Sequence, residues 1–269
     1  MKVAAIQMVS TPEVAQNLHA AGALLKRAAE AGAELALLPE YFCLLGRRDD
    51  DKLRIAEAPG DGPIQQFLSE TARSLGLWLI GGTLPLRTTG TADPARVLNS
   101  CCSYGPDGTA LPRYDKIHLF AFDNGRERYD EGRVLQAGTL ALALQMGALR
   151  VGLSVCYDLR FPELYRALMQ PPCDLIVVPS AFTYTTGRAH WDLLLRARAV
   201  ENQCYVLAAA QGGTHANGRR TWGHSQLIDP WGDVVELLPD GEGVVIGEVD
   251  AARIHEVRMQ LPALAHRRL

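Results

Sequence analysis

Apolar positions along the chain fall into short runs that alternate with amphipathic segments. Val3–Val9 is an almost continuous apolar run, typical of a buried strand. Thr11-Pro12-Glu13 can cap and begin a helix, and apolar residues then recur with a period near 3.6 until Gly32. Leu35–Leu38 is a second short apolar run that ends at Pro39-Glu40. The beginning of the chain therefore predicts a strand, a helix and another strand.

The alternation continues to the end of the chain. Further helices are predicted at Pro63–Leu75, Pro162–Met169, Ala189–Asn202 and Asp250–Met259. Further strands are predicted at Leu77–Ile80, Val97–Tyr104, Leu140–Gln145, Leu149–Val155, Leu175–Val178 and Cys204–Ala210.

Turn signals separate several of these elements. Gly105-Pro106-Asp107-Gly108 and Asp229-Pro230-Trp231-Gly232 predict hairpin turns, and Ile117–Arg133 has no clean period and is predicted to be a long loop. Strands that alternate with helices, with hairpins among them, predict one α/β domain over residues 1–269 with mixed sheets.

Composition narrows the class of protein. Hydrophobic residues make up 48% of the chain, charged residues 21%, and the net charge is −3. These values are typical of a globular protein and lack the basic excess of a nucleic-acid binder. The first apolar run is too short for a secretory signal, and no run approaches the roughly 18 apolar residues of a membrane span. We therefore expect a soluble cytoplasmic protein with no nucleic-acid or membrane partner.

The six cysteines form no CxxC pair, and no histidines have ligand spacing. A zinc site or a redox motif is therefore not expected, and free buried thiols fit the pattern best. We predict no metal and no cofactor. Any one of the thiols can still be catalytic.

Cys156 stands where an apolar strand runs into a helix that opens with Pro162-Glu163. Backbone N–H groups at such a turn stabilise anions, lower the pKa of a thiol and can direct the N–H of Tyr157 at a developing oxyanion. The alternative is a small buried core residue, and the local sequence leaves both interpretations open.

A thiol nucleophile needs a base, and no histidine has a persuasive context for that role; His118 and His190 fit structural hydrogen bonding better. Glu40 ends a buried strand, where ligands of α/β sheets gather, and is suited to general-base work. Lys116 lies among apolar residues and can place an ammonium over a site. A solvated Glu40 and a surface Lys116 paired with Asp115 remain the alternatives.

Three segments resemble the motifs of the carbon–nitrogen hydrolase (nitrilase) superfamily, in the same order and with similar spacing. They are Leu-Leu-Pro-Glu at 37–40, Lys-Ile-His-Leu at 116–119 and Cys-Tyr-Asp-Leu-Arg-Phe-Pro-Glu-Leu at 156–164. The resemblance implies a four-layer α-β-β-α sandwich with two mixed β-sheets, a homodimer or higher oligomer, and no cofactor. It also implies a catalytic triad of Glu40, Lys116 and Cys156. A second active-site glutamate is implied in the following loop, where Glu131 is the best match and Glu127 the competitor.

Segments of the second half resemble the Nit branch of this superfamily. Within that branch they are most similar to the deaminated-glutathione amidases, whose close relatives are ω-amidases of α-keto acids. The segments are Pro179-Ser180-Ala181-Phe182, Gly187-Arg188-Ala189-His190-Trp191 and Asp229-Pro230-Trp231-Gly232. The resemblance implies hydrolysis of a small linear amide through a thioester. An anionic substrate of that kind needs cationic or hydrogen-bonding partners, and the candidates by motif position are Tyr157, Arg160, Thr183, Tyr184 and Arg188. Arg160 can instead pair with Asp158 or Glu163, and the segment from Thr183 to Arg188 resembles a substrate-facing loop.

Two other functions remain open at this stage. The same scaffold supports hydrolysis of N-carbamoyl amino acids or of nitriles. A catalytically silent binding protein of this fold is a third hypothesis, which an intact set of Glu40, Lys116 and Cys156 disfavours.

Overall fold

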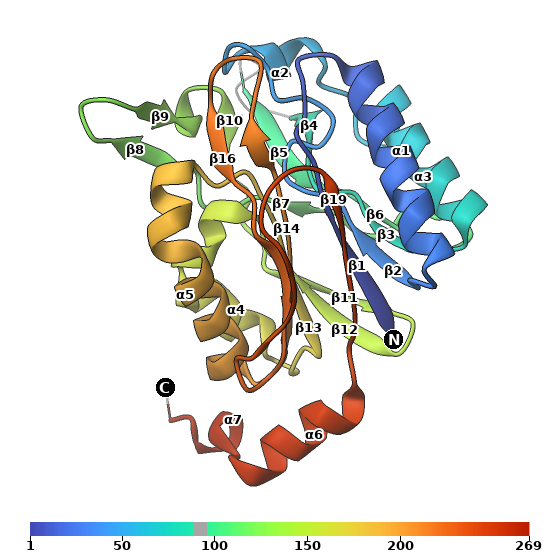
Figure 1. The fold of residues 1–269 in the computed structure, drawn as a ribbon, viewed down its shortest axis with the longest axis vertical. Helices are drawn as coiled ribbons and strands as arrows, with labels where there is room; N and C mark the ends of the chain where they lie inside the picture. The colour runs from blue at the N-terminus through green and yellow to red at the C-terminus, as the bar shows by residue number, and fades with distance from the viewer. Residues whose placement is uncertain (89–95, 269) are drawn as a thin grey trace.

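Two mixed β-sheets pack face to face between pairs of helices in the computed structural model, which describes residues 1–88 and 96–268 (Figure 1). The first sheet has the order β19-β1-β2-β3-β6 and the second β11-β12-β13-β14-β17-β18. The strands of the first sheet are β1 (Lys2–Gln7), β2 (Leu35–Leu37), β3 (Trp78–Ile80), β6 (Ser103–Tyr104) and β19 (Gly243–Glu248). Those of the second are β11 (Leu142–Met146), β12 (Leu149–Leu153), β13 (Leu175–Ser180), β14 (Tyr205–Ala210), β17 (Ser225–Ile228) and β18 (Val234–Leu238).

Smaller sheets and hairpins extend this frame. A third sheet contains β4 (Leu84–Arg87), β5 (Val97–Cys101), β7 (Tyr114–Asp115) and β10 (Leu135–Gln136). Two antiparallel hairpins are formed by β8 (Ala121–Asp123) with β9 (Arg128–Asp130) and by β15 (Gly212–Thr214) with β16 (Arg220–Trp222).

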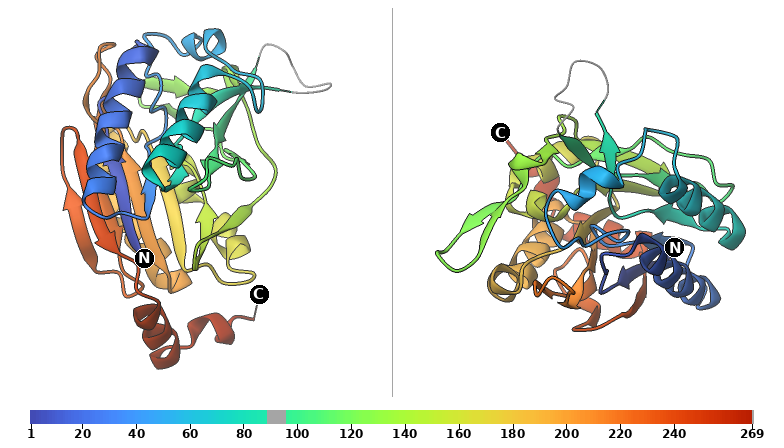
Figure 2. Two further views of the ribbon diagram at one scale, coloured as in Figure 1. Left: turned by 90° about the vertical axis from the view of Figure 1, so that its right-hand side faces the viewer. Right: turned by 90° about the horizontal axis from the view of Figure 1, so that it is seen from above.

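The helices pack around the two main sheets. They are α1 (Val14–Glu30), α2 (Asp51–Arg54), α3 (Pro63–Leu75), α4 (Pro162–Leu168), α5 (Tyr184–Asn202), α6 (Ala251–Gln260) and α7 (Ala263–His266), with the 3₁₀ turns η1 (Glu131–Arg133) and η2 (Cys156–Arg160). Figure 2 shows α1 and α3 side by side over the first sheet, while α4 and α5 lie over the second in Figure 1. The arrangement confirms the predicted four-layer α-β-β-α sandwich with two mixed sheets.

The apolar runs of the sequence follow from this layering. The parallel strands β1, β2 and β3, and likewise β12, β13 and β14, are covered on both faces, so nearly every side chain in them is buried. One apolar cluster fills the space between the sheets and under α4 and α5, and a second lies between the first sheet and α1 and α3. Two sets of parallel strands therefore direct their carboxyl ends toward one region between the sheets.

Three sequence predictions need correction. The predicted strand Val97–Tyr104 is divided at Cys102, because its first part joins the third sheet as β5 while Ser103–Tyr104 joins the first sheet as β6. The predicted loop Ile117–Arg133 contains the β8–β9 hairpin and the η1 turn. The predicted substrate-facing loop from Thr183 to Arg188 is the beginning of α5, where the Thr183 hydroxyl accepts a hydrogen bond from the N–H of Thr186.

The remaining predicted elements are confirmed with small shifts at their ends. The helix Pro63–Leu75 has the predicted bounds and ends at Gly76, whose φ is +65°. In the part of the chain that the structure covers, no helix combines the length and the apolar character needed to cross a bilayer.

Candidate active site

Cys156 lies at the point where β12 leaves the second sheet and the η2 turn begins. Its φ of +50° falls in the left-handed region, which side chains other than glycine rarely adopt. Such a conformation costs about 1–3 kcal/mol and persists only where the surroundings hold it. The Cys156 side chain is nearly buried and lines a cavity between the two sheets.

Asp158 holds this turn in place. One of its carboxylate oxygens accepts hydrogen bonds from the N–H of Val155 at 2.8 Å and the hydroxyl of Tyr114 at 2.7 Å. The other accepts from the N–H of His118 at 3.0 Å and lies 2.7 Å from its Nδ1. Asp158 therefore joins the turn that carries Cys156 to the segment that carries Lys116. His118 has the structural hydrogen-bonding role that the sequence favoured.

Glu40 lies three residues beyond the end of β2 and is buried, with a relative exposure of 1%. Its Oε1 accepts hydrogen bonds from Nζ of Lys116 at 2.9 Å and from Nδ2 of Asn99 at 3.0 Å. Its Oε2 accepts from the N–H of Ala181 at 2.9 Å. The alternative of a solvated strand-end glutamate is therefore wrong. The contacts fix the carboxylate from three different segments of the chain.

Gly82 permits the turn that presents Glu40. A Cβ atom built at Gly82 would lie 2.0 Å from the carbonyl oxygen of Pro39, and the φ of Gly82 is +55°. Any other residue at this position would displace the peptide before Glu40 or strain the backbone.

Lys116 follows β7 and is completely buried between two carboxylates. Its Nζ lies 2.9 Å from Oε1 of Glu40 and 2.7 Å from Oε2 of Glu131. Asp115, which the sequence offered as its partner, pairs with Arg113 instead. The alternative of a surface Lys116 is therefore wrong.

The charges of this cluster stabilise one another. Burial by itself would lower the pKa of Lys116, but Glu131 and Glu40 outweigh burial and raise it, so the ammonium stays charged. Burial opposes ionisation of Glu131, but Lys116 and then Lys52 reverse this effect and lower the pKa of Glu131 to about 2. A buried ammonium and two carboxylates therefore form one hydrogen-bonded, ion-paired cluster.

Cys156 behaves differently from the expectation based on its turn. Burial raises the pKa of the Cys156 thiol well above its usual range, Glu40 raises it further, and Lys116 only partly opposes them. The expected lowering by the turn is therefore wrong for the unliganded enzyme, because desolvation and a neighbouring carboxylate dominate. The free thiol is neutral at pH 7 and must pass its proton to a base before it can attack.

Glu131 rather than Glu127 lies in the cluster with Lys116 and Glu40. In addition to Lys116, Glu131 accepts hydrogen bonds from the hydroxyl of Tyr41 and the N–H of Phe120, both at 2.7 Å. Glu127 accepts instead from the hydroxyl of Thr185 at 2.8 Å and lines a neighbouring cavity.

The reaction cavity is the space bordered by Glu40, Glu131 and Cys156. Of the substrate-binding candidates, Tyr157, Arg160 and Thr183 also line it. The guanidinium of Arg160 does not pair with Asp158 or Glu163. It lies 5.7 Å from the ring centroid of Tyr157 and 5.5 Å from that of Phe182. Its Nη1 lies 3.2 Å from Nδ1 of His190, and no carboxylate of the described residues pairs with it. A cation that borders the cavity in this way is suited to an anionic group of a substrate.

Two candidates from the sequence do not reach this cavity. Arg188 is exposed on α5 and does not line it. Tyr184 packs against Trp222, with ring centroids 5.2 Å apart, and carries the guanidinium of Arg220 on its ring. Both predictions assumed a loop at this place, whereas the helix turns these side chains outward.

Five other lining residues were not among the candidates predicted from the sequence. They are Phe120, Ala181, Phe182, Thr186 and Arg219. Arg219 comes from the β15–β16 hairpin, far from any of the motifs, and its position depends on how that hairpin packs. No local pattern in the sequence marks it.

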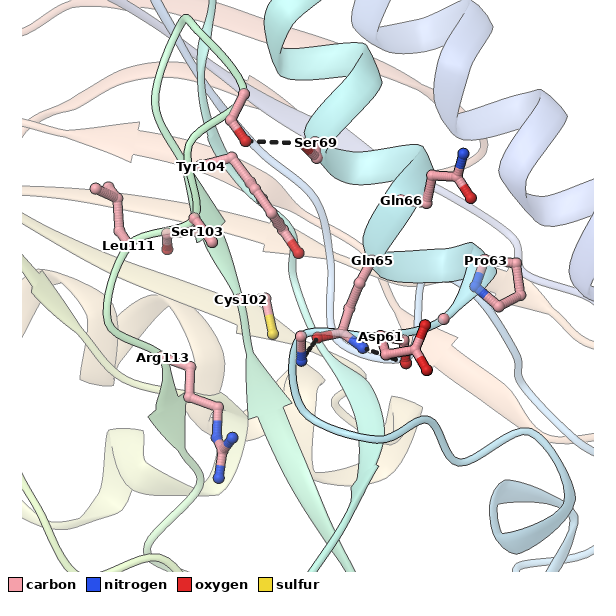
Figure 3. Close-up of a pocket in the computed structure, with 14 residues that line it drawn as sticks. Asp61, Pro63, Gln65, Gln66, Ser69, Cys102, Ser103, Tyr104, Leu111 and Arg113 are labelled. Carbon is pink, nitrogen blue, oxygen red and sulfur yellow. Dashed lines mark hydrogen bonds between the residues drawn. The ribbon is translucent and has the colours of Figure 1, made fainter.

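Another cavity lies beside α3, with a volume of about 640 Å³ (Figure 3). Ser69 and Gln65 of α3, Tyr104 of β6 and Arg113 line it, and Figure 3 shows Ser69 bonded across to a backbone oxygen. None of the four clustered residues described above borders this space. Within residues 1–88 and 96–268, no three histidine, cysteine or carboxylate side chains have the arrangement of a metal site.

Comparisons with known proteins place this site in a family. A sequence model of the family "Carbon-nitrogen hydrolase" matches residues 2–259. The deaminated glutathione amidase of Synechocystis sp. is 39% identical, over 98% of this chain and 97% of the relative. The omega-amidase NIT2 of Danio rerio is 38% identical, over 99% of this chain and 94% of the relative.

Solved structures agree with the sequence comparisons. The crystal structure of the C. elegans NitFhit protein superposes with a TM-score of 0.90 at 37% identity, and covers 99% of this chain and 65% of that one. Sequence, fold and the arrangement of the three motifs point the same way. The chain belongs to the carbon–nitrogen hydrolase family.

Proposed function

We propose that this enzyme is an amidase that hydrolyses a small linear amide through a thioester on Cys156. The observation that carries the proposal is that Cys156 and Glu40 line one cavity, while the buried ammonium of Lys116 lies directly behind it, 2.9 Å from Oε1 of Glu40. A thiol, a carboxylate base and a fixed cation are the groups that acyl transfer through sulfur requires.

In the first half of the reaction, Glu40 takes the proton of the Cys156 thiol as sulfur attacks the amide carbonyl carbon. The carbonyl oxygen becomes an oxyanion, which Lys116 Nζ and the N–H of Tyr157 stabilise. When the tetrahedral intermediate collapses, the C–N bond breaks and the leaving nitrogen takes the proton from Glu40. The acyl group remains on Cys156 as a thioester.

In the second half, water attacks the thioester while Glu40 takes one of its protons. The C–S bond then breaks, the acid leaves, and the proton returns from Glu40 to sulfur. Glu131 is a positioning residue in this scheme, because it accepts a second hydrogen bond from Nζ of Lys116 in addition to the one that Glu40 accepts. No step uses a metal or a cofactor.

The substrate class that we propose is an amide of an α-keto acid, either deaminated glutathione or a related ω-amide. Arg160 supports an anionic substrate, because its guanidinium borders the cavity beside Cys156. Thr183, also in the wall, is suited to a polar group of the acyl chain. Relatives named for both substrates make these the first compounds to test.

We further propose a cytoplasmic homodimer. All six cysteines are unpaired, which agrees with a reducing compartment. Leu193 and Val200 of α5 are apolar and 67% and 49% exposed, and Trp231 is 50% exposed, which supports burial of this face against a second copy. Light scattering that gives a monomer mass at working concentrations would contradict the dimer.

The function is tested by incubating the protein with deaminated glutathione, α-ketoglutaramate, an N-carbamoyl amino acid and a nitrile. Release of the dipeptide amine or of ammonia is then measured. We expect turnover of at least one keto-acid amide and loss of at least about 10⁴-fold in Cys156→Ala. Equal activity in that variant would exclude the nucleophile, while turnover of only the carbamoyl compound or the nitrile would reject the substrate class.

A further inference from the structure

A second cavity adjoins the reaction cavity and carries a concentrated positive charge. It lies between α2, the β8–β9 hairpin and the β15–β16 hairpin, has a volume of about 460 Å³, and is called the basic chamber below. Seven of its lining side chains are cationic and two, Asp49 and Glu127, are anionic. The chain as a whole has a net charge of −3, so this concentration of cations is local.

Most of these cations have no carboxylate partner in the described part of the chain. Arg48 pairs with Asp50, and Arg128 lies 3.7 Å from Asp123. The other five form no ion pair with any described residue; they are Arg47, Lys52, Arg126, Arg219 and Arg220. Cations that outnumber the carboxylates around a cavity repel one another and attract an anion.

Arg219 connects the basic chamber to the reaction cavity, because it lines both. Its Nη2 donates a hydrogen bond to the carbonyl oxygen of Ala181 at 2.9 Å, and its guanidinium lies 4.9 Å from the ring centroid of Tyr129. Its Nε is buried and has no hydrogen-bond partner. A buried N–H without an acceptor is costly, so the guanidinium retains a capacity for an anionic ligand.

Tyr41 is a second link between the two spaces. It lines the basic chamber, and its hydroxyl donates to Glu131 at 2.7 Å. The ammonium of Lys52 lies 4.7 Å from the centroid of the same ring. Tyr41 therefore borders the chamber on one side and contacts Glu131 of the catalytic cluster on the other.

The chamber and the reaction cavity also differ in volume. The reaction cavity offers only about 10 Å³, which is close to the space of a single water, whereas the chamber offers about 460 Å³. A long substrate whose amide reaches Cys156 has space for its remaining atoms in the chamber.

We propose that the basic chamber binds a carboxylate at the remote end of an extended amide substrate. Arg219, the chamber residue that lies nearest the scissile bond, contacts this carboxylate. The substrate class is then a peptide-like amide with one anionic group on the acyl side and another on the leaving amine. This inference rests on the proposed function and extends it. A short ω-amide, whose leaving group is ammonia, gains nothing from the chamber.

The test compares deaminated glutathione with its terminal carboxamide, which has the same length and scissile bond but lacks the remote charge. We expect wild-type kcat/KM to favour the carboxylate by about tenfold to a hundredfold, as for a charge-assisted hydrogen bond. Arg219→Met should reduce this preference to less than about threefold. Arg126→Gln, which changes the chamber without removing a contact to Ala181, should reduce it partly.

Lys26→Gln is the matched control, because Lys26 is an exposed cation of α1 that pairs with Glu30 and lines neither the chamber nor the reaction cavity. It should leave the preference unchanged. An equal kcat/KM for the two compounds in the wild type, or an equal loss for both in Arg219→Met, would overturn the proposal. An equal loss is the result expected if Arg219 only supports Ala181 and, through it, Glu40.

Binding to the Cys156→Ala variant separates this proposal from the proposed function. Calorimetry on that variant gives a Kd for each compound without turnover. If neither compound is hydrolysed by the wild type, the proposed substrate fails, but a tighter Kd for the carboxylate that depends on Arg219 still supports the chamber. Equal Kd values reject the chamber whatever the enzyme hydrolyses.

Discussion

The Nζ atom of Lys116 lies 2.7 Å from Oε2 of Glu131, a residue 15 positions further along the chain in the η1 turn. Together with the bond from Lys116 to Glu40, this contact places one buried ammonium between two carboxylates. Removing one member of such a unit leaves the other charges uncompensated.

We therefore expect Glu131→Gln to lower kcat by about a hundredfold or more, because Lys116 loses the contact that fixes it toward the oxyanion. Glu127→Gln is the matched variant, since Glu127 lies in the same segment but does not touch Lys116. It should change kcat far less. Steady-state kinetics of the two variants decide between the glutamates, and a larger kcat loss in Glu127→Gln would reverse the assignment.

Glu131 should also make stability depend on acid pH. Its pKa is about 2 in the folded protein, against about 4.3 for an unfolded glutamate. A lowered folded pKa contributes stability that is complete above the unfolded value and is lost as pH falls toward 2. Urea unfolding between pH 5 and 2.5 should show wild-type stability decreasing with a steeper slope than that of Glu131→Gln. Parallel slopes would show that Glu131 is not the titrating group.

The raised pKa of Cys156 predicts slow alkylation at neutral pH. Since Glu40 contributes to that rise and Lys116 opposes it, Glu40→Gln should shift the pH profile of iodoacetamide modification to lower pH, and Lys116→Met to higher pH. Mass spectrometry measures the rate, with Cys156→Ala as the blank for the other thiols. Glu40→Gln should nonetheless lose nearly all turnover, because the base is gone.

Asp158 should matter for stability through its hydrogen bonds to Val155, Tyr114 and His118. Asp158→Ala leaves several buried donors without an acceptor, and we expect a loss of about 3 kcal/mol or more in the free energy of unfolding. Tyr114→Phe removes only one of these bonds and should cost about 1 kcal/mol. Denaturant titrations compare them, and similar losses for both variants would contradict the role of Asp158 as the centre of the network.

Gly82→Ala should damage the site through the contact of Gly82 with Pro39, the residue before Glu40. The added Cβ would lie 2.0 Å from the carbonyl oxygen of Pro39, so the peptide that leads to Glu40 must move. Gly76→Ala is the control, because Gly76 also has a positive φ but open space around it, and it should cost only about 1 kcal/mol. We expect Gly82→Ala alone to reduce kcat. If both variants keep full turnover, the close approach to Pro39 does not position Glu40.

Local sequence patterns were sufficient to predict much of the fold. Apolar runs and helical periods predicted the helices over 63–75 and 162–169 and the paired strands around Gly147, because burial on both faces of a sheet leaves a signal in each segment. The break at Cys102 and the early start of α5 left no such signal, since they depend on which sheet a strand joins and on a cap at Thr183.

The sequence by itself determined the class of protein, because Glu40, Lys116 and Cys156 each lie in a short motif whose order in the chain is distinctive. It left open Glu131 against Glu127, and it gave no sign of Arg219. Only the tertiary structure places Glu131 against Lys116 and Arg219 in the cavity wall, because both positions depend on how loops and hairpins pack against the sheet ends. The tertiary structure also raises the pKa of the Cys156 thiol. Desolvation and Glu40 cause this rise through space, and no local pattern in the sequence predicts it.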